Sequence, residues 1–144
     1  MKWVTRSRVH VDRVACPWLI KRFVDTRAEF IFVARNLVPE IAQKEGAIPF
    51  DTGPVELGHH DGHCTFVTIV QHYNLTDPAL LMLADVVNAA DTGKLDENPY
   101  ARGLEAIAVG FGLRFTDDYE NLEHQFLAYD ALYNFFRIEA ARKE

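Results

Sequence analysis

Glu56-Leu57-Gly58-His59-His60-Asp61-Gly62-His63-Cys64 divides the chain into two halves with different sequence patterns. Before this segment, short β-branched and aromatic runs alternate with turn residues, which is typical of short strands and helices. After it, apolar residues recur at helical spacing. Because glycines flank its central residues, we expect the segment itself to be a turn. The sequence therefore predicts an α+β fold, with a small N-terminal sheet, a mostly helical C-terminal half and this turn at the junction.

The first half carries three strand signals, at Trp3–Thr5, Ala28–Val33 and Ile48–Phe50. The second is the richest in β-branched and aromatic residues. A helix is expected to open at Cys16-Pro17-Trp18 and to run to about Asp25, because proline is favoured in the first turn of a helix. A shorter helix is expected from Val38 to Lys44.

The second half predicts four helices, at Thr65–Tyr73, Asp77–Asp91, Pro99–Phe115 and Asp117–Ala141. The second of these opens on Asp-Pro, an N-cap residue followed by the residue preferred at the first helical position. The third is expected to be broken or frayed by two glycines near its end, Gly110 and Gly112.

The length and composition indicate one domain covering residues 1–144. Hydrophobic residues make up 49% of the chain, enough for a core without disulfides. The net charge of −6 argues against a nucleic-acid partner, which needs a basic surface. The chain shows no secretion signal and no apolar run of the roughly 18 residues that a membrane span needs. We therefore expect a cytoplasmic protein with no membrane partner, and a homodimer is left open.

The junction segment is also dense in side chains that bind metals or transfer protons. Imidazole, thiolate and carboxylate are the ligands of zinc and other first-row transition metals. The spacing matches no standard zinc finger, so further ligands must come from elsewhere in the chain. We expect a divalent ion (iron, zinc or manganese) whose ligands come from this set: His59, Asp91, Glu56, Glu123 and Cys64. The alternative is a solvated, histidine-rich surface loop.

A second candidate site surrounds Cys16. We expect this thiol at or just before a helix N-terminus, where N–H groups and the helix dipole lower a thiol pKa and favour anions. Arg13, joined by Arg22, would then hold an oxyanion or carboxylate through paired contacts. The alternative is an inert, buried cysteine beside Trp18, with Arg13 paired to a core carboxylate.

Tyr129 is a third candidate, as an acid or hydrogen-bond donor in Tyr129-Asp130-Ala131-Leu132-Tyr133. Tyr129 and Tyr133 share one face of the expected closing helix. The alternative is aromatic core packing, with each hydroxyl bonded to a polar partner.

These motifs together resemble the chromate-resistance domain, the C-terminal half of ChrB-type chromate-resistance proteins. The resemblance extends from about Trp3 to Phe136, and the motifs that carry it are Asp12-Arg13-x-Ala15-Cys16-Pro17-Trp18-Leu19-Ile20-x-Arg22-Phe23-x-Asp25, Ala28-Glu29-Phe30-x-Phe32-Val33, Ile48-Pro49-Phe50-Asp51, His59-x4-Cys64-Thr65-Phe66, Ala90-Asp91-Thr92 and Tyr129-Asp130-Ala131-Leu132-Tyr133. The resemblance implies a cytoplasmic protein linked to chromate or oxidative stress. His59 and Cys64 match the family pattern, whereas His60 and His63 do not, so His59 is the expected essential ligand.

Three functions are compatible with these observations. The first is a small metal-dependent enzyme or metalloprotein that acts on a small anionic substrate or oxyanion, with redox, lyase and hydrolase chemistry all open. The second is a non-enzymatic domain that senses or binds metal or chromate and signals through a partner. The third is thiol redox chemistry through Cys16 and Cys64, which requires an exposed thiol of low pKa.

Overall fold

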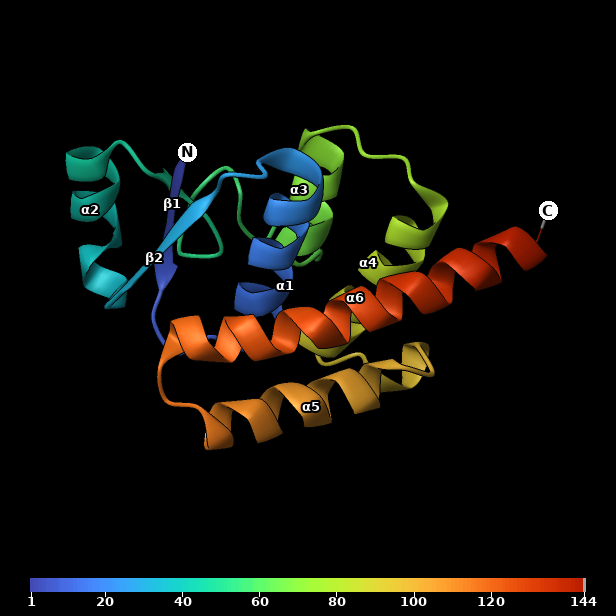
Figure 1. The fold of residues 1–144 in the computed structure, drawn as a ribbon. Helices are drawn as coiled ribbons and strands as arrows, with labels where there is room; N and C mark the ends of the chain where they lie inside the picture. Colours follow the sequence, from blue (N-terminus) through green and yellow to red (C-terminus); the bar gives the residue numbers. More distant parts are fainter. Residues whose placement is uncertain (144) are drawn as a thin grey trace.

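A three-stranded parallel sheet occupies the N-terminal part of the computed structural model, which describes residues 1–143. Its strands are β1 (Lys2–Arg6), β2 (Glu29–Val33) and β3 (Ile48–Pro49), in the order β2-β1-β3. The central strand aligns Trp3 with Phe30 on one side and with Ile48 on the other. The expected α+β class, with the sheet at the N-terminus, is confirmed (Figure 1).

Six α-helices lie within the described residues, and four of them follow the junction segment. Their bounds are α1 (Val11–Leu19), α2 (Val38–Glu45), α3 (Thr65–His72), α4 (Pro78–Asp91), α5 (Ala101–Arg114) and α6 (Asp118–Arg142). A π-helical turn, Ile20–Val24, continues α1, and 3-10 turns occupy Arg35–Leu37 and Leu95–Glu97. The long α6 packs against both α1 and α4, as Figure 1 shows in red across the centre.

Both faces of the small sheet are buried, because side chains alternate in direction along each strand. Val4 and Ile31 point to one face, where they pack with Val38 at the start of α2. Trp3 and Phe30 point to the other face and join the main core with α1, α3, α4 and α6. The sheet thus lies between α2 and the helical half, and its C-terminal edge faces the junction segment.

Local capping explains why α4 and α6 begin where the sequence predicted. The Asp77 carboxylate accepts the backbone N–H groups of Ala79 and Leu80, and Asp117 accepts that of Tyr119. Each satisfies donors that a helix start leaves without a partner.

The expected start of the first helix was wrong. The helix begins at Val11, so Cys16 and Pro17 lie inside it rather than at its N-terminus. Pro17 has no backbone N–H, so the helix lacks the hydrogen bond to the Arg13 carbonyl, and a proline at such a position normally disfavours a helix. Burial overrides that preference, because all but one residue of α1 is buried. The chain then widens into the π-helical turn, which ends with the Asp25 N–H donating to the Ile20 carbonyl at 2.7 Å.

The expected break in α5 was also wrong. The helix runs without interruption through Gly110 and Gly112 to Arg114. A glycine in a helix costs about 1 kcal/mol relative to alanine, which the packing of Leu104 and Ala108 against the core offsets.

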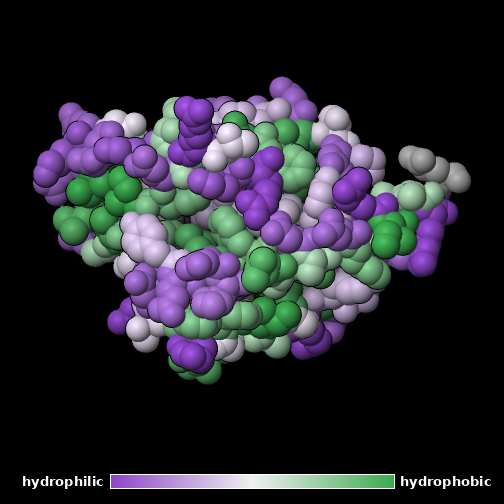
Figure 2. All heavy atoms as spheres, viewed as in Figure 1, coloured by the Kyte–Doolittle hydropathy of each residue, from purple (hydrophilic) through white to green (hydrophobic). Residues whose placement is uncertain are grey.

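None of the helices in residues 1–143 combines the length and the apolar character needed to cross a membrane. On the face of the molecule that Figure 2 shows, hydrophobic residues gather over α2 and along α5 and α6. Leu113 on α5 and Leu127 on α6 are 82% and 70% exposed. Whether a second copy of the chain covers this surface stays a prediction.

Asp130 on α6 joins the final helix to the π-helical turn. Its carboxylate accepts the indole N–H of Trp18 at 2.8 Å and two bonds from the Arg22 guanidinium at 3.1 and 3.0 Å. Trp18 is only 1% exposed, so its N–H depends on this carboxylate for a hydrogen-bond partner.

We expect Asp130→Ala to lower the free energy of unfolding by about 1–3 kcal/mol, the usual effect of leaving a buried donor unpaired. For a domain of this size, 1 kcal/mol shifts the melting temperature by roughly 2–4 °C. The matched control is Glu139→Ala, which removes an exposed ion pair with Arg142 on the same helix and should have little effect. Denaturant titration of both variants checks this, and equal stability of the two would contradict it.

Candidate metal centre

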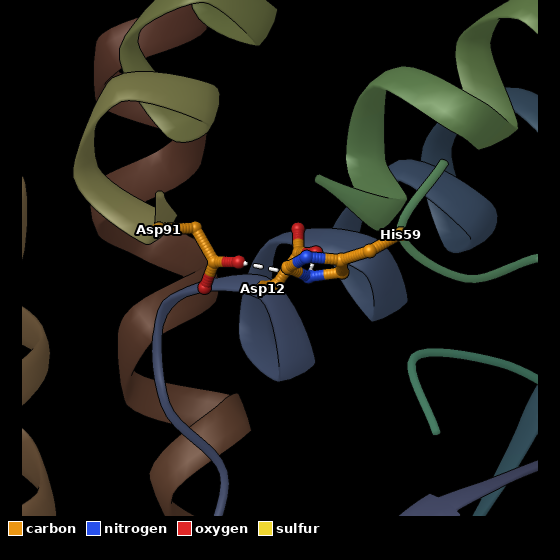
Figure 3. A group of neighbouring side chains, drawn as sticks. All are labelled: Asp12, His59 and Asp91. Atoms are coloured by element: carbon orange, nitrogen blue, oxygen red, sulfur yellow. Dashed lines mark ion pairs between the residues drawn. The ribbon is translucent and has the colours of Figure 1, made fainter. Parts of the chain in front are cut away.

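Three aspartate carboxylates converge on one nitrogen of His59. The His59 Nε2 atom lies 3.1 Å from Asp91 Oδ2, 3.3 Å from Asp51 Oδ1 and 3.5 Å from Asp12 Oδ2. Figure 3 shows Asp12 on α1, Asp91 on α4 and His59 on the junction segment pointing toward one another. We call Asp12, Asp51, Asp91 and His59 the carboxylate cluster. They come from four separate parts of the chain.

Asp12 is the anchored member of the carboxylate cluster. It lies in the first turn of α1, is 2% exposed, and accepts the backbone N–H groups of Thr65 and Phe66 at 2.7 and 3.2 Å. These are the first N–H groups of α3, whose own N-cap residue, Cys64, makes no side-chain cap. Asp12 therefore caps α3 from another helix, and the Cys16 thiol donates to it at 3.4 Å.

Asp51 follows β3 in a left-handed backbone conformation, with φ of 48°. Aspartate tolerates this region better than most residues. Its carbonyl accepts bonds from Thr5 and Arg6, and its Oδ1 accepts the Thr65 hydroxyl at 2.8 Å. The other oxygen faces the Arg13 guanidinium at 3.5 Å. The end of β1 thus holds the backbone of Asp51, while Thr65 of α3 and Arg13 of α1 hold its carboxylate.

The junction segment forms the expected turn and presents His59 to solvent. Asp61 and Gly62 have φ of 53° and 77°, and His60 and His63 exchange backbone hydrogen bonds across them. Two positive φ values are the mark of a tight hairpin turn. The His60 ring bonds to carbonyls of its own loop, and neither His60 nor His63 belongs to the group of close ligand atoms. His59 is 51% exposed at the side chain.

The burial and close approach of the charged groups in the carboxylate cluster shift the pKa values of Asp51, Asp91 and His59. Burial, followed by the charge of Asp12, raises the pKa of Asp51 to about 6 and that of Asp91 to about 7. The contact with Asp12, together with the charges of all three aspartates, raises the pKa of His59 to about 9 despite its partial burial. The site therefore favours a positive charge at the position of the imidazole nitrogen.

Of the five expected metal ligands, the structure brings two together, His59 and Asp91. Glu56 is 80% exposed and pairs with His72, and Glu123 is exposed on α6. Cys64 is buried next to the cluster, where its backbone N–H donates to Asn88. Asp12 takes the place that the sequence interpretation gave to a glutamate.

Arg13 and Cys16 lie beside the carboxylate cluster in roles other than those expected. Arg13 points to Asp51 and donates to the Arg8 carbonyl at 2.9 Å, which matches the alternative of pairing with a core carboxylate. Cys16 is fully buried within α1, and burial and the charge of Asp12 raise its thiol pKa well above the ordinary value. Burial also raises the pKa of Cys64. The expected low thiol pKa is therefore wrong, because neither thiol meets a free helix N-terminus in water.

Tyr129 lies in the core rather than in an opening. It is fully buried, packs against Trp18 with ring centroids 6.1 Å apart, and donates its hydroxyl proton to the Val11 carbonyl at 3.4 Å. Burial raises its pKa well above the ordinary value. This is the aromatic packing given above as the alternative.

A cavity of about 190 Å³ adjoins the carboxylate cluster, and sequence reasoning missed its basic residues. Arg6 and Arg35 line it together with His59 and Asp51. Sequence reasoning also missed Asp12 and Asp51 as cluster members. Both lie in motifs that carry the family resemblance, and that was the only signal in the sequence that could have identified them.

Replacing Asp12 should separate its capping from its charge. Asp12→Ala removes both bonds to the start of α3 and should lower the free energy of unfolding by at least the 1.5–3 kcal/mol typical of one hydrogen bond to a charged group, given as a rough guide. Asp12→Asn keeps an acceptor oxygen and should recover part of that loss. Chemical denaturation of both variants checks this, and an Asp12→Ala variant as stable as the wild type would rule out the capping role.

The raised pKa values of Asp51, Asp91 and His59 should lower the stability of the metal-free protein as the pH rises, from about pH 4 to about 6 and 7 for the two aspartates and from about pH 6.5 to about 9 for His59. The raised pKa of His59 stabilises the fold below about 6.5, its unfolded value, and this contribution is lost as the pH rises through about 9. Asp51 and Asp91 likewise favour their protonated forms in the folded state and lose that contribution as the pH rises through about 6 and about 7.

Melting temperatures of chelator-treated protein across this range check the direction. His59→Ala should flatten the upper part of the profile, whereas His63→Ala should leave it unchanged. A wild-type melting temperature that rises toward about pH 9 would contradict the assigned pKa shift of His59.

Comparison with known proteins places this chain in a family. No solved structure matches the chain. A curated relative, Protein ChrB of Cupriavidus metallidurans, is 30% identical over 137 residues, which cover 94% of this chain and 40% of that protein. The chain thus spans about 40% of the length of the curated relative. The family described as "ChrB, C-terminal domain" matches residues 3–136. The chain therefore belongs to the chromate-resistance family, as a ChrB C-terminal domain.

Proposed function

We propose that this domain binds one divalent transition-metal ion at the carboxylate cluster and uses it as an open centre for chemistry on a small anionic substrate, in a chromate-related context. The observation that carries the proposal is the convergence of three carboxylates on the single Nε2 atom of His59, within 3.1–3.5 Å. Asp12, His59 and Asp91 are the proposed ligands, and Asp51 is the adjacent fourth donor.

The spacing of the donor atoms fits a metal ion. Ligand atoms bonded at about 2.1 Å to one ion lie roughly 3.0–3.4 Å apart in octahedral or tetrahedral geometry. The distances from Nε2 to the three carboxylates fall in or next to this range. The ligand atoms of Asp12, His59 and Asp91 all lie within 4.8 Å of one another, so small side-chain rotations complete the geometry. One imidazole with carboxylate oxygens suits iron, zinc or manganese.

The charge balance supports the same proposal. Three largely buried carboxylates at one point are unfavourable unless positive charge compensates them. Arg13 and the more distant Arg6 compensate Asp51, whereas within residues 1–143 Asp91 forms an ion pair only with His59. A divalent ion would replace the His59 proton and restore ordinary ionisation of Asp51 and Asp91.

The openness of the site favours a reactive centre over a structural one. Structural metal sites are closed by protein ligands, whereas catalytic sites keep a position for water or substrate. His59 is half exposed, and the cavity of about 190 Å³ adjoins it. A bound divalent ion supplies Lewis acidity, which polarises a substrate oxygen or lowers the pKa of a bound water.

The surrounding residues hold the ligands in position. The N-terminus of α3 orients Asp12, and Thr65 and Arg13 orient Asp51. Such supporting contacts typically change metal affinity by about 10–100-fold. Arg13 therefore acts here as a positioning residue for the carboxylate.

Chelator-treated protein should take up about one equivalent of Mn²⁺, Fe²⁺ or Zn²⁺ per chain. His59→Ala and Asp91→Asn should each weaken binding by more than about 100-fold, because losing a direct ligand exceeds the effect of a supporting contact. The matched controls are His63→Ala in the same loop and Asp85→Asn, which is exposed on the same helix as Asp91. Calorimetric titration with elemental analysis measures both. Wild-type protein that stays metal-free with all three ions would rule out the proposal.

A cobalt-substituted protein distinguishes an open centre from a closed, sensor-type site. We expect azide to change the visible spectrum of the Co²⁺ form, because an added anion enters a free coordination position. Metal uptake with a spectrum that azide leaves unchanged would favour the non-enzymatic metal-sensing alternative.

A further inference from the structure

The cavity beside His59 continues into a larger groove. The groove has a volume of about 710 Å³, and it shares Arg35, Thr52 and Gly53 with the cavity of about 190 Å³. Small-molecule sites in proteins typically measure about 300–1,000 Å³. The two spaces together therefore have room for a ligand larger than a simple inorganic ion.

The inner end of this space is basic. Arg6 and Arg35 line the cavity, and Arg35 makes no ion pair with any of residues 1–143. Burial, followed by the nearby guanidiniums of Arg13 and Arg35, lowers the pKa of Arg6. The one carboxylate in the cavity wall, Asp51, is already engaged by Thr65 and Arg13. An anion at this end would thus meet guanidinium donors that Asp51 does not fully occupy.

The outer end of the space is apolar. Its walls come from the start of α2 and from the loop after β3, and the apolar residues among them are Val38, Pro39, Pro49, Pro54 and Val55. Three prolines in these walls restrict backbone motion, so the groove needs little ordering when a ligand binds. Apolar surface of this kind contributes affinity only for a ligand that carries apolar atoms.

We infer that this groove binds a small organic anion, with a carboxylate or phosphate head on Arg6 and Arg35 and an apolar body against Val55 and the prolines. The head then lies beside His59, at the open side of the carboxylate cluster. The inference deepens the proposed function by naming its substrate class, and it rests on that function for any chemistry at the head. Binding in the groove does not require the metal.

The ligand class follows from the shape and the charge together. A bare inorganic oxyanion would contact the two arginines and leave the apolar walls in water. A neutral apolar molecule would gain no contact with the charges of Arg6 and Arg35. Only a ligand with an anionic head and an apolar body contacts both the arginines and the apolar walls.

The test compares matched anions on the full, metal-free chain by NMR titration. Benzoate is paired with acetate, and phenyl phosphate with inorganic phosphate, so that each pair differs in the apolar body. We expect the aromatic member of at least one pair to bind ten times more tightly or better, with shifts at residues 35–39 and 52–55. Comparing the two pairs identifies the preferred head.

Variants assign the two ends separately. Arg35→Gln should weaken all anions of the preferred head about tenfold, whereas Val55→Ser should weaken only the aromatic member. The matched control is Arg102→Gln, an exposed arginine on α5 paired with Asp96, which should change neither. Melting curves verify that each variant is folded.

If the aromatic member binds ten times more tightly in neither pair, the inference is overturned. Metal uptake without any preference for the aromatic anions rejects the groove and leaves the metal centre standing. A clear preference in a chain that takes up no metal rejects the metal centre and leaves the groove standing.

Discussion

The buried carboxylate of Asp12 is the interaction on which the rest of this structure depends. It caps α3 from α1, accepts the Cys16 thiol and lies 3.5 Å from the His59 ring nitrogen. Removing the carboxylate would leave the start of α3 without acceptors and shift the segment that carries His59. One side chain thus connects the packing of two helices to the geometry of the candidate metal centre, so stability and function are coupled at this point.

The same region concentrates charge of both signs in a small volume. Three aspartates and His59 form the carboxylate cluster, while Arg6, Arg13 and Arg35 gather on the side of Asp51. A domain built only for stability would replace such groups by apolar side chains, which is often neutral or favourable. Their concentration in one half-open corner is the pattern of perturbed groups that is enriched at functional sites.

Local signals in the sequence predicted most of the fold, and long-range pairing explains what they missed. Helix caps such as Asp77 and the run of β-branched and aromatic residues in β2 are local, so those elements were predicted correctly. Pro17 indicated a helix start because its cost is local, but burial of α1 through contacts across the whole domain overrides it. In the site, His59 and Asp91 were predicted, whereas Asp12 and Asp51 were not. Their convergence depends on the parallel sheet and on α3, which no spacing along the chain reveals.

The order of the chain has a consequence for when the site can form during synthesis. All members of the carboxylate cluster lie between residues 12 and 91, so they leave the ribosome before α5 and α6. Yet α6 packs against α1 and α4, and its Asp118 holds the backbone N–H groups of Arg8 and Val9 just ahead of α1. A nascent or truncated chain that ends before α6 carries every donor atom without the helix that aligns them. If the proposed ion binds here, a full set of aligned ligands would arise only when the last helix docks, so an incomplete chain would bind it weakly.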